Sequence, residues 1–368
     1  MAYYIVKRLL LMIPTLFGMM LMSFVIIQFA PGGPVERLIS QLHGHSASEA
    51  GSIGGGTGDM GTGASSQAAT NEAFGQYRGA QGIDPELIAK LNKQFGFDRP
   101  AYERFFKMMW NYMRFDFGDS FFKQRPVLEL IRDKLPVSIT LGMWMLVLSY
   151  GISIPMGIRK AMQDGTRFDV WSTSLVILGS AIPSFLFAVL LIILFAGGNY
   201  LNIFPRKGLG SDNWDQLTYL QRVLDYLWHI VLPISSMAIG GFASLTLLTK
   251  NSFIDEIKKQ YVVTARAKGL NDFQVLYGHV FRNAMLLVIS GFPAAFFGAF
   301  VEGSLLIEYT FSLDGLGRLS YEAVKGRDYP IVFATLFIFG LIGLLLQLVS
   351  DLTYTAVDPR IDFETREV

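Results

Sequence analysis

The side chains best placed to bind a partner lie in a basic segment from Lys250 to Asn283, between two long apolar runs. The segment carries the run Thr264-Ala265-Arg266-Ala267-Lys268-Gly269, in which small and basic residues alternate. Lysine and arginine between two membrane spans are expected on the cytoplasmic side. The chemistry predicted here is recognition of a cytoplasmic protein rather than a reaction on a substrate.

Residue patterns typical of enzymes are missing or incomplete. The run from Gly56 to Gly61 fits G-x-G-x-x-G, but it follows no predicted strand and lies in a glycine-rich tract. The chain has no Walker A loop and no cysteine. His43 and His45 lack the further ligands that a metal site needs, and His229 and His279 each stand alone near a span end. We therefore expect no catalytic residue, metal site or cofactor on this chain.

The composition predicts a membrane protein. Of 368 residues, 51% are hydrophobic and only 17% are charged, against about 25% charged residues in an average soluble domain. Six apolar runs approach the roughly 20 residues that cross a bilayer as a helix. They are Leu9 to Ala30, Leu135 to Gly157, Val170 to Ala196, Leu227 to Leu248, Asn283 to Ser304 and Ile331 to Tyr354. The predicted fold class is an all-α polytopic membrane protein with six transmembrane helices.

The positions of lysine and arginine predict that both termini are cytoplasmic. Basic residues concentrate in the segments that lie inside when the N-terminus is inside. They are Lys7, Arg8, Arg159, Lys160, Arg167, Lys250, Lys258, Lys259, Arg266, Lys268, Arg282, Arg360 and Arg366. The first span is predicted to be an uncleaved anchor, because its apolar run exceeds a signal core and the run from Ile27 to Pro31 offers no A-x-A site.

The long outer loop, residues 31–134, divides into two parts. Residues 43–82 are rich in Gly, Ser, Ala and Thr, which predicts a flexible insertion. Residues 84–134 are predicted to hold helices from Pro85 to Gly96, from Pro100 to about Phe115 and from Pro126 to Lys134. The middle region is dense in aromatic residues, which fits a helix against the membrane surface or a neighbouring subunit, or else the core of a small outer subdomain. These residues are Tyr102, Phe105, Phe106, Trp110, Tyr112, Phe115, Phe117, Phe121 and Phe122.

Two helices joined by a tight turn are predicted in the basic inner segment. Ser252 with Asp255 resembles a capping box that opens a helix ending at Gly269. Asn271 with Gln274 opens a second helix. The apolar faces are predicted to comprise Phe253, Ile254, Ile257, Tyr261 and Ala265 in the first helix and Phe273, Leu276, Tyr277 and Val280 in the second. The unit fits an amphipathic helix on the inner leaflet as well as a docking site.

A resemblance favours the docking site. The run from Tyr261 to Leu270, followed by the run from His279 to Ala284, resembles the coupling loop of inner-membrane permeases of binding-protein-dependent ABC importers, in the dipeptide/oligopeptide branch. Further runs resemble that branch: Phe29 to Val35, Phe95 to Pro100, Phe117 to Ser120, Ile307 to Arg318, Arg327 to Pro330 and Asp358 to Arg360. The long outer insertion makes the chain most similar to permeases for oligopeptides and for peptide-nucleotide antibiotics of the microcin C kind.

The chain also departs from the family pattern. The general importer loop has Glu-Ala-Ala before its glycine and Leu-Pro after it, where this chain has Val263-Thr264-Ala265 and Phe281-Arg282. Gly33 stands where Asp is common, and Asp314 stands where Pro is common. The geometry of these turns is therefore not carried over from the family.

The resemblance implies a type I ABC importer permease fold in a bacterial inner membrane. Residues 1–30 would form the N-terminal segment and first span, 135–354 the permease core with the coupling loop 250–283, and 355–368 a cytoplasmic tail. The implied partners are a second homologous permease in a heterodimer, two ATPase subunits that hold ATP and Mg, a periplasmic peptide-binding protein, the peptide substrate and membrane lipid, but no nucleic acid. A helix from residue 252 to 269 would transmit ATPase movement through Tyr261, Thr264, Ala265, Arg266, Ala267, Lys268 and Gly269.

The fifth predicted span offers candidates for the substrate path. Small residues recur every four positions, at Gly291, Ala295, Ala299 and Gly303. Such a strip lets helices approach closely where two subunits meet or a pore narrows, and equally in packing within one subunit. Glu302 either faces the substrate entry or lies in the interfacial region.

The rival hypothesis is an ion-coupled secondary carrier or a channel for small solutes. Ion-coupled carriers place several acidic or histidine side chains near the membrane midplane, whereas the deepest parts of these spans are nearly free of charge. This contrast favours a permease driven by separate ATPase subunits.

Overall fold

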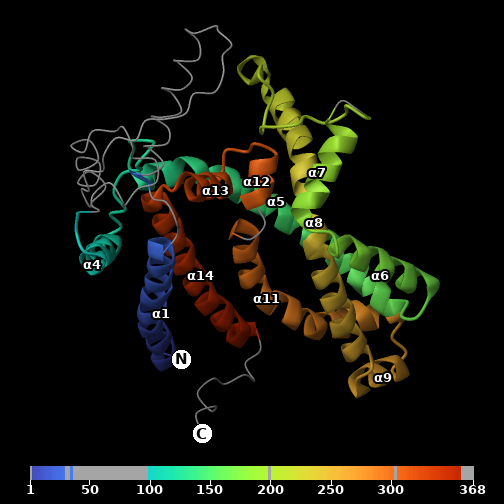
Figure 1. Cartoon of the computed structure of the whole chain (residues 1–368). Coiled ribbons are helices and arrows are strands. Elements are labelled where there is room, and N and C mark those ends of the chain that lie inside the picture. Colours follow the sequence, from blue (N-terminus) through green and yellow to red (C-terminus); the bar gives the residue numbers. More distant parts are fainter. Residues whose placement is uncertain (1, 30–33, 36–97, 198–199, 302–304, 358–368) are drawn as a thin grey trace, which may run out of the picture. The chain divides into compact units, whose positions relative to one another are not determined.

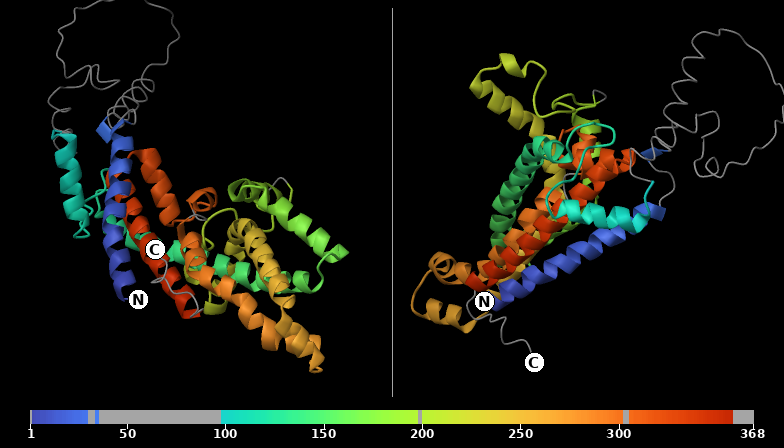
Figure 2. Two further views of the ribbon diagram at one scale, coloured as in Figure 1. Left: turned by 90° about the horizontal axis from the view of Figure 1, so that it is seen from below. Right: turned by 90° about the vertical axis from the view of Figure 1, so that its left-hand side faces the viewer.

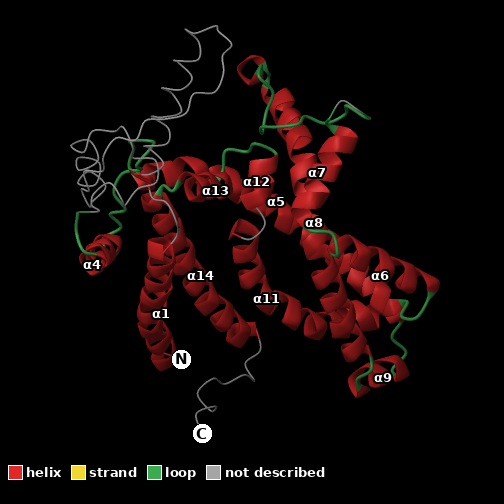
Figure 3. Cartoon of the chain, viewed as in Figure 1, coloured by secondary structure: helices red, strands yellow, loops and turns green. Residues whose placement is uncertain are grey.

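The computed structural model describes residues 2–29, 34–35, 98–197, 200–301 and 305–357. Over these ranges the chain consists of helices and their connections, with one isolated bridge between Asp119 and Pro126 and no strand (Figure 3). The predicted all-α class is confirmed. The predicted flexible insertion, the predicted helix from Pro85 to Gly96 and residues 358–368 of the tail lie outside the described residues.

Five helical stretches among the described residues are long and apolar enough to cross a membrane. They are contributed by α1 (Ala2–Phe29), α5 (Val127–Met162), α8 (Tyr219–Ile257), a stretch from Asp272 to Phe296 that ends within α11 (Phe281–Val301), and α14 (Tyr329–Val357). A sixth is obtained when α6 (Arg167–Ser180) and α7 (Ser184–Phe195) are taken as one bent span. The six predicted spans therefore each correspond to helical structure.

The third predicted span, Val170 to Ala196, is not one straight helix. Its two parts, α6 and α7, are bent by 95° at their break. Pro183 lies at this break in an extended conformation, with a ψ of 133°, and caps α7. Proline lacks the N–H that would continue the helix and disfavours a helical conformation in the residue before it. Four other prolines lie inside apolar helices that continue past them: Pro14, Pro155, Pro233 and Pro293.

Two helices are longer than predicted. The short helix predicted before the second span is not separate, since α5 runs unbroken from Val127 through that span. The helix α8 starts at a capping box formed by Thr218 and Gln221 and continues for 39 residues. At 1.5 Å per residue it covers about 58 Å, nearly twice the roughly 30 Å of hydrocarbon in a bilayer. Part of α8 therefore extends beyond the hydrocarbon layer.

The chain divides into two compact units, residues 1–14, 131–321 and 338–368, and residues 15–130 and 322–337. In the first unit α8 contacts α6, α7, α11 and α12 (Leu305–Thr310) (Figures 1 and 2). One apolar core contains Leu141, Ile230 and Ile307, and a second contains Phe253 with residues of the inner segment. The two cores place α8 at the centre of this unit.

A buried carboxylate fixes the turn between α12 and α13 (Leu316–Gly326). The Glu308 side chain is fully buried, and it accepts hydrogen bonds from Ser138 Oγ at 2.6 Å and from the backbone N–H of Arg318 at 3.0 Å. A Cβ atom added at Gly315 would lie 2.5 Å from the Glu308 carboxylate carbon. A side chain at position 315 would therefore have to displace the buried carboxylate.

The two further departures from the family pattern have different outcomes. Asp314 accepts a hydrogen bond from Lys134 Nζ, so an exposed ion pair stands where proline is common. Gly33 lies outside the described residues.

Aromatic side chains form the centre of the second unit. Phe105 and Tyr112 of α4 (Ala101–Tyr112) are buried, and the Phe105 ring lies 5.3 Å from that of Phe24 in α1. The Tyr112 ring lies 5.6 Å from that of Phe337. Other aromatic residues predicted from the same region are exposed: Tyr102, Phe106, Trp110 and Phe115. The region thus has a buried aromatic core and also a set of exposed rings.

Two of the family-like runs meet in the second unit. The buried carboxylate of Asp328 accepts hydrogen bonds from Ser120 Oγ at 2.5 Å and from the Phe121 N–H at 3.1 Å. Ser120 ends the run that starts at Phe117, and Asp328 belongs to the run from Arg327 to Pro330. The two runs therefore stabilise a common turn.

We expect Gly315→Ala to lower the melting temperature of the purified chain in detergent. The added methyl group must displace the Glu308 carboxylate, and overpacking of this kind costs about 1–3 kcal/mol. Gly151→Ala in α5 is the matched control, because a Cβ there meets no atom within 4 Å. Equal melting temperatures for the two variants would contradict the steric role of Gly315.

Candidate functional site

The inner segment consists of short elements between α8 and α11. The helix α9 (Gln260–Ala267) follows α8 after Lys258 and Lys259, and Figure 1 shows it beyond the end of α8. The helix α10 (Asp272–Val275) and a π-helical turn (Leu276–Val280) then lead into α11. The predicted order of helix, tight turn and helix is confirmed.

The predicted start of the first inner helix at Ser252 is wrong. The helix α8 continues through Ser252 to Ile257, and Lys259 is the N-cap of α9. Ser252 Oγ donates a hydrogen bond to the carbonyl of Ala284 at 2.5 Å, which joins α8 to α11. The adjacent Phe253 is fully buried, so packing of α8 overrides the capping pattern. The helix predicted over residues 252–269 is therefore divided between the end of α8 and the eight-residue α9.

The predicted end of α9 at Gly269 is confirmed. Gly269 has a φ of +88°, a conformation that L side chains rarely adopt. Its N–H donates to the carbonyl of Arg266 at 2.9 Å, and the N–H of Leu270 donates to the carbonyl of Ala265 at 3.4 Å. These are the two bonds of a Schellman motif, and Leu270 supplies the apolar contact that accompanies it.

The predicted start of the second helix is also confirmed. Asn271 Oδ1 accepts from the backbone N–H of Gln274 at 2.8 Å, and Gln274 Oε1 accepts from the N–H of Asn271 at 3.1 Å. This reciprocal capping box follows directly after the Schellman motif. The direction of the chain between α9 and α10 is thus fixed by local hydrogen bonds.

An apolar core holds α9 against the spans. Val262 and Ala265 of α9 are buried with Phe253 of α8 and with Leu276 and Val280 of the π-helical turn. Helices shorter than roughly 12 residues are marginal in water on their own. The packing of this core therefore supplies most of the stability of α9.

Tyr261 is partly buried at the edge of this core. Its hydroxyl donates to Glu256 Oε2 at 2.7 Å. Burial raises the pKa of Tyr261, and the Glu256 carboxylate acts in the same direction. The phenol therefore remains a neutral donor that joins α9 to the end of α8.

The opposite face of the inner segment exposes apolar side chains. Val263, Phe273 and Tyr277 are 57%, 71% and 48% exposed, and the rings of Phe273 and Tyr277 lie 4.7 Å apart. Helical spacing predicts Phe273 and Tyr277 on the buried face, and this is wrong. The π-helical turn places Val275 and Val280, five residues apart, on the buried face instead.

The seven predicted coupling residues therefore divide by exposure. Ala265 is buried and Tyr261 is partly buried, whereas Thr264, Arg266, Ala267, Lys268 and Gly269 are exposed. Together with the three exposed apolar side chains, these five make up the exposed basic and apolar part of the inner segment, which we call the inner surface. Its members are Val263, Thr264, Arg266, Ala267, Lys268, Gly269, Phe273 and Tyr277.

The predicted path residues lie on or just beyond α11. Gly291 is exposed, and a Cβ there would meet no atom within 4 Å, while Ala295 is partly buried. Ala299 lies in the helix, but its side chain is outside the described set, as are Glu302 and Gly303. The small-residue strip thus begins at an uncovered position of α11.

The described residues contain no group of three or more His, Asp or Glu side chains that could hold a metal ion. His229 is buried, and its Nδ1 lies 2.7 Å from the carbonyl oxygen of Asp225, as for a hydrogen-bonded histidine. His43 and His45 lie outside the described residues.

Comparison with known proteins identifies the family. Residues 153–363, more than half of the chain, match the model of the binding-protein-dependent transport system inner membrane component. The chain is 61% identical over 368 residues, all of both chains, to the peptidoglycan transport system permease protein YejB of Agrobacterium fabrum. It is 56% identical, over all of both chains, to the inner membrane ABC transporter permease protein YejB of Escherichia coli O157:H7.

A more distant relative is the oligopeptide transport system permease protein AppB of Bacillus subtilis, 30% identical over 99% of this chain and 100% of that one. These relatives are permease subunits and not enzymes. The chain belongs to the inner-membrane permeases of binding-protein-dependent ABC importers, as the resemblance of its motifs predicts.

Proposed function

We propose that this permease imports oligopeptides, including peptide-nucleotide antibiotics of the microcin C type, and that separate ATPase subunits drive it through the inner surface. The observation that carries the proposal is an exposed basic and apolar face on a short helix whose other face is packed against two spans. The names of the relatives refer to peptidoglycan and to oligopeptides, which are both peptide-containing. A peptide is therefore the substrate class that best fits the relatives.

The packing of α9 explains how movement would reach the membrane. Val262 belongs to the core shared by α5, α8 and α11, so a displacement of α9 by a docked ATPase would displace these helices. Rigid movement of packed helices is a common way to switch a transporter. In this proposal ATP and Mg bind to the partner subunits, and nucleotide-driven closure changes the path from inward to outward access.

The basic residues of the inner segment support a cytoplasmic position for it. Lys258, Lys259 and Lys268 are exposed there, and positive charge between spans is retained on the cytoplasmic side. With this orientation, both termini are cytoplasmic and the loop from residue 31 to 134 is periplasmic, where a peptide-binding protein would deliver the substrate.

The path itself is proposed to lie between this chain and a second, homologous permease. Gly291 supports this arrangement, because no atom of the described chain covers the space beside it. A strip of small residues at such a position would let a partner helix approach closely. Ala295, Ala299 and Gly303 would continue the strip, and Glu302 would lie near its outer end.

The experiment that tests the proposal is peptide uptake into proteoliposomes. The chain is reconstituted with its second permease, ATPase subunits and binding protein, and then with each of these omitted. We expect ATP-dependent uptake only with the full set. Uptake by this chain alone, driven by an ion gradient and independent of ATP, would contradict the proposal in favour of a secondary carrier.

We expect Gly269→Val to reduce peptide-stimulated ATP hydrolysis while abundance and membrane insertion stay normal. A left-handed conformation costs an L residue roughly 1–2 kcal/mol, and valine is β-branched, so the turn that orients α9 should open. Gly278→Ala is the control, because Gly278 has no positive φ and its Cβ would meet nothing within 4 Å. If peptide stimulates ATP hydrolysis equally in the Gly269 variant and the unaltered chain, the turn has no role in coupling.

A further inference from the structure

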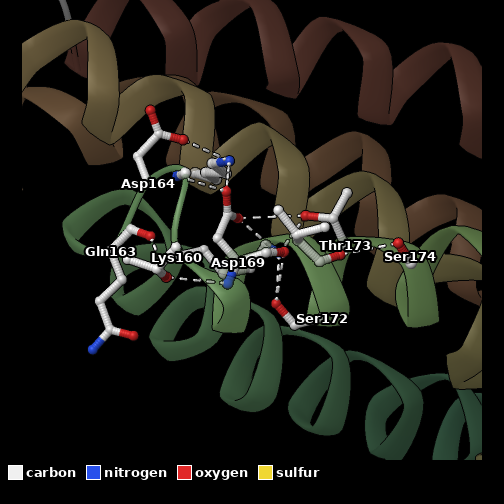
Figure 4. Close-up of polar contacts among 11 residues, drawn as sticks. Lys160, Gln163, Asp164, Asp169, Ser172, Thr173 and Ser174 are labelled. Atoms are coloured by element: carbon white, nitrogen blue, oxygen red, sulfur yellow. Dashed lines mark hydrogen bonds and ion pairs between the residues drawn. The ribbon is translucent and has the colours of Figure 1, made fainter.

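A second feature of the first unit is a buried charge cluster that no motif explains. Lys160, near the end of α5, has no exposed surface. Its Nζ lies 3.1 Å from Asp169 Oδ1 and donates to the hydroxyls of Ser172 and Thr173 at 2.7 and 2.6 Å. Figure 4 shows these side chains gathered around Asp169 at the start of α6. Lys160 is therefore an internal ion-pair residue rather than an exposed charge at the membrane surface.

The same carboxylate also binds a lysine from α8. Lys250 Nζ donates to Asp169 Oδ2 at 2.6 Å and lies 2.9 Å from Asp164 Oδ1. The backbone N–H of Gly165 donates to Asp169 Oδ2 at 3.2 Å. Asp169 thus uses one oxygen for each lysine, and it connects α5, the turn before α6, and α8.

Close packing beside the cluster holds the same helices together. A Cβ atom added at Gly157 of α5 would lie 2.6 Å from the Cβ of Thr249 in α8 and 2.8 Å from the carbonyl oxygen of Thr246. The two backbones therefore approach as closely as a glycine allows. This contact is adjacent in sequence to both lysines and does not depend on their charges.

The cluster is also next to the core that supports α9. Phe253, one helical turn beyond Lys250, is fully buried in that core, and Ile158 of α5 belongs to it as well. The segment of α8 from Lys250 to Phe253 therefore contacts α9 through apolar atoms and the α5–α6 turn through ion pairs. A displacement of α9 therefore acts on the same part of α8 that holds the α5–α6 turn through ion pairs.

Burying these charges is energetically unfavourable unless each has a partner, and ionisable residues within membrane spans usually have a functional role. We propose that Lys250 is a positioning residue for energy coupling, which ties the α5–α6 turn to α8 through Asp164 and Asp169, so that movement of α9 carries α5 and α6 with α8. The inference rests on the proposed ATPase coupling. It adds the α5–α6 turn and α6 to the helices that receive the movement, since α5 already contacts the core around α9.

Lys250→Met tests the link without leaving a buried charge unpaired, because Asp169 keeps its ion pair with Lys160. In the assembled importer we expect unchanged abundance, melting temperature and basal ATP hydrolysis. Peptide transported per ATP hydrolysed should fall roughly five- to tenfold, within the usual range for allosteric coupling. Lys250→Arg should restore most of the loss, and Lys107→Met, which removes an exposed charge from α4, should have no effect.

A covalent cross-link in place of the Lys250 ion pairs distinguishes a role of Lys250 in energy coupling from a role in folding alone. The chain has no cysteine, so in the variant Asp164→Cys with Lys250→Cys the two introduced thiols are the only ones of this chain that a short bis-maleimide can join. We expect little peptide transported per ATP hydrolysed before cross-linking, and recovery of this ratio after it. Normal coupling in Lys250→Met, or no recovery or a block of transport on cross-linking, would overturn the inference. Absence of ATP-dependent uptake by the unaltered importer would instead overturn the proposed function.

Discussion

The contact on which the proposed mechanism depends is the apolar core between α9 and the helices α5, α8 and α11. Phe253 is its fully buried centre, and Val262 brings the eight-residue α9 into it. Burying a side chain of this size is worth about 1.5–3 kcal/mol relative to water, which a helix of two turns cannot obtain from its own hydrogen bonds. Without this core, α9 would be a surface helix with no means of moving the spans. With it, the same helix contributes to the inner surface on one side and belongs on the other to a core shared with three spans.

Buried carboxylates have a recurring role in the rest of the structure. Glu308 fixes the turn after α12, Asp328 fixes the turn that contains Ser120, and Asp169 joins two lysines. In each case the carboxylate oxygens accept hydrogen bonds from irregular backbone or from side chains on another helix. Helices alone satisfy their backbone inside a membrane, so the connections between them need such acceptors. Two of these acidic residues, Glu308 and Asp328, belong to family-like runs.

Local signals predicted the helix ends well. Gly269 and the Asn271–Gln274 capping box act through neighbouring backbone atoms, so the residues themselves are sufficient to place the turn. Ser252 carried the same kind of signal and failed, because its hydroxyl bonds to Ala284 in α11, a contact between helices that spacing along the sequence cannot reveal. The exposure of Phe273 was missed for a related reason, since the π-helical turn changes the period on which the prediction relied.

The positions of charged residues predicted less of the structure than the local signals for helix ends did. Lys160 was counted only as a positive charge of an inner segment, and its position near a span end did not reveal its ion pair with Asp169, nine residues later. The pairing with Lys250, which is 81 residues from Asp169, could not be read from the sequence. The 95° bend at Pro183 could not be read from the sequence, because proline shows where a helix can break but not the angle that tertiary packing imposes.

The most direct test of this account is photo-cross-linking from the inner surface in the assembled importer. A benzophenone maleimide is attached to Phe273→Cys, the only cysteine in that variant, and Phe106→Cys in α4, similarly exposed, serves as the control. The account predicts that illumination joins position 273 to an ATPase subunit, while position 106 gives no such product. Adducts of position 273 with lipid alone would contradict the account and indicate a helix that rests on the membrane.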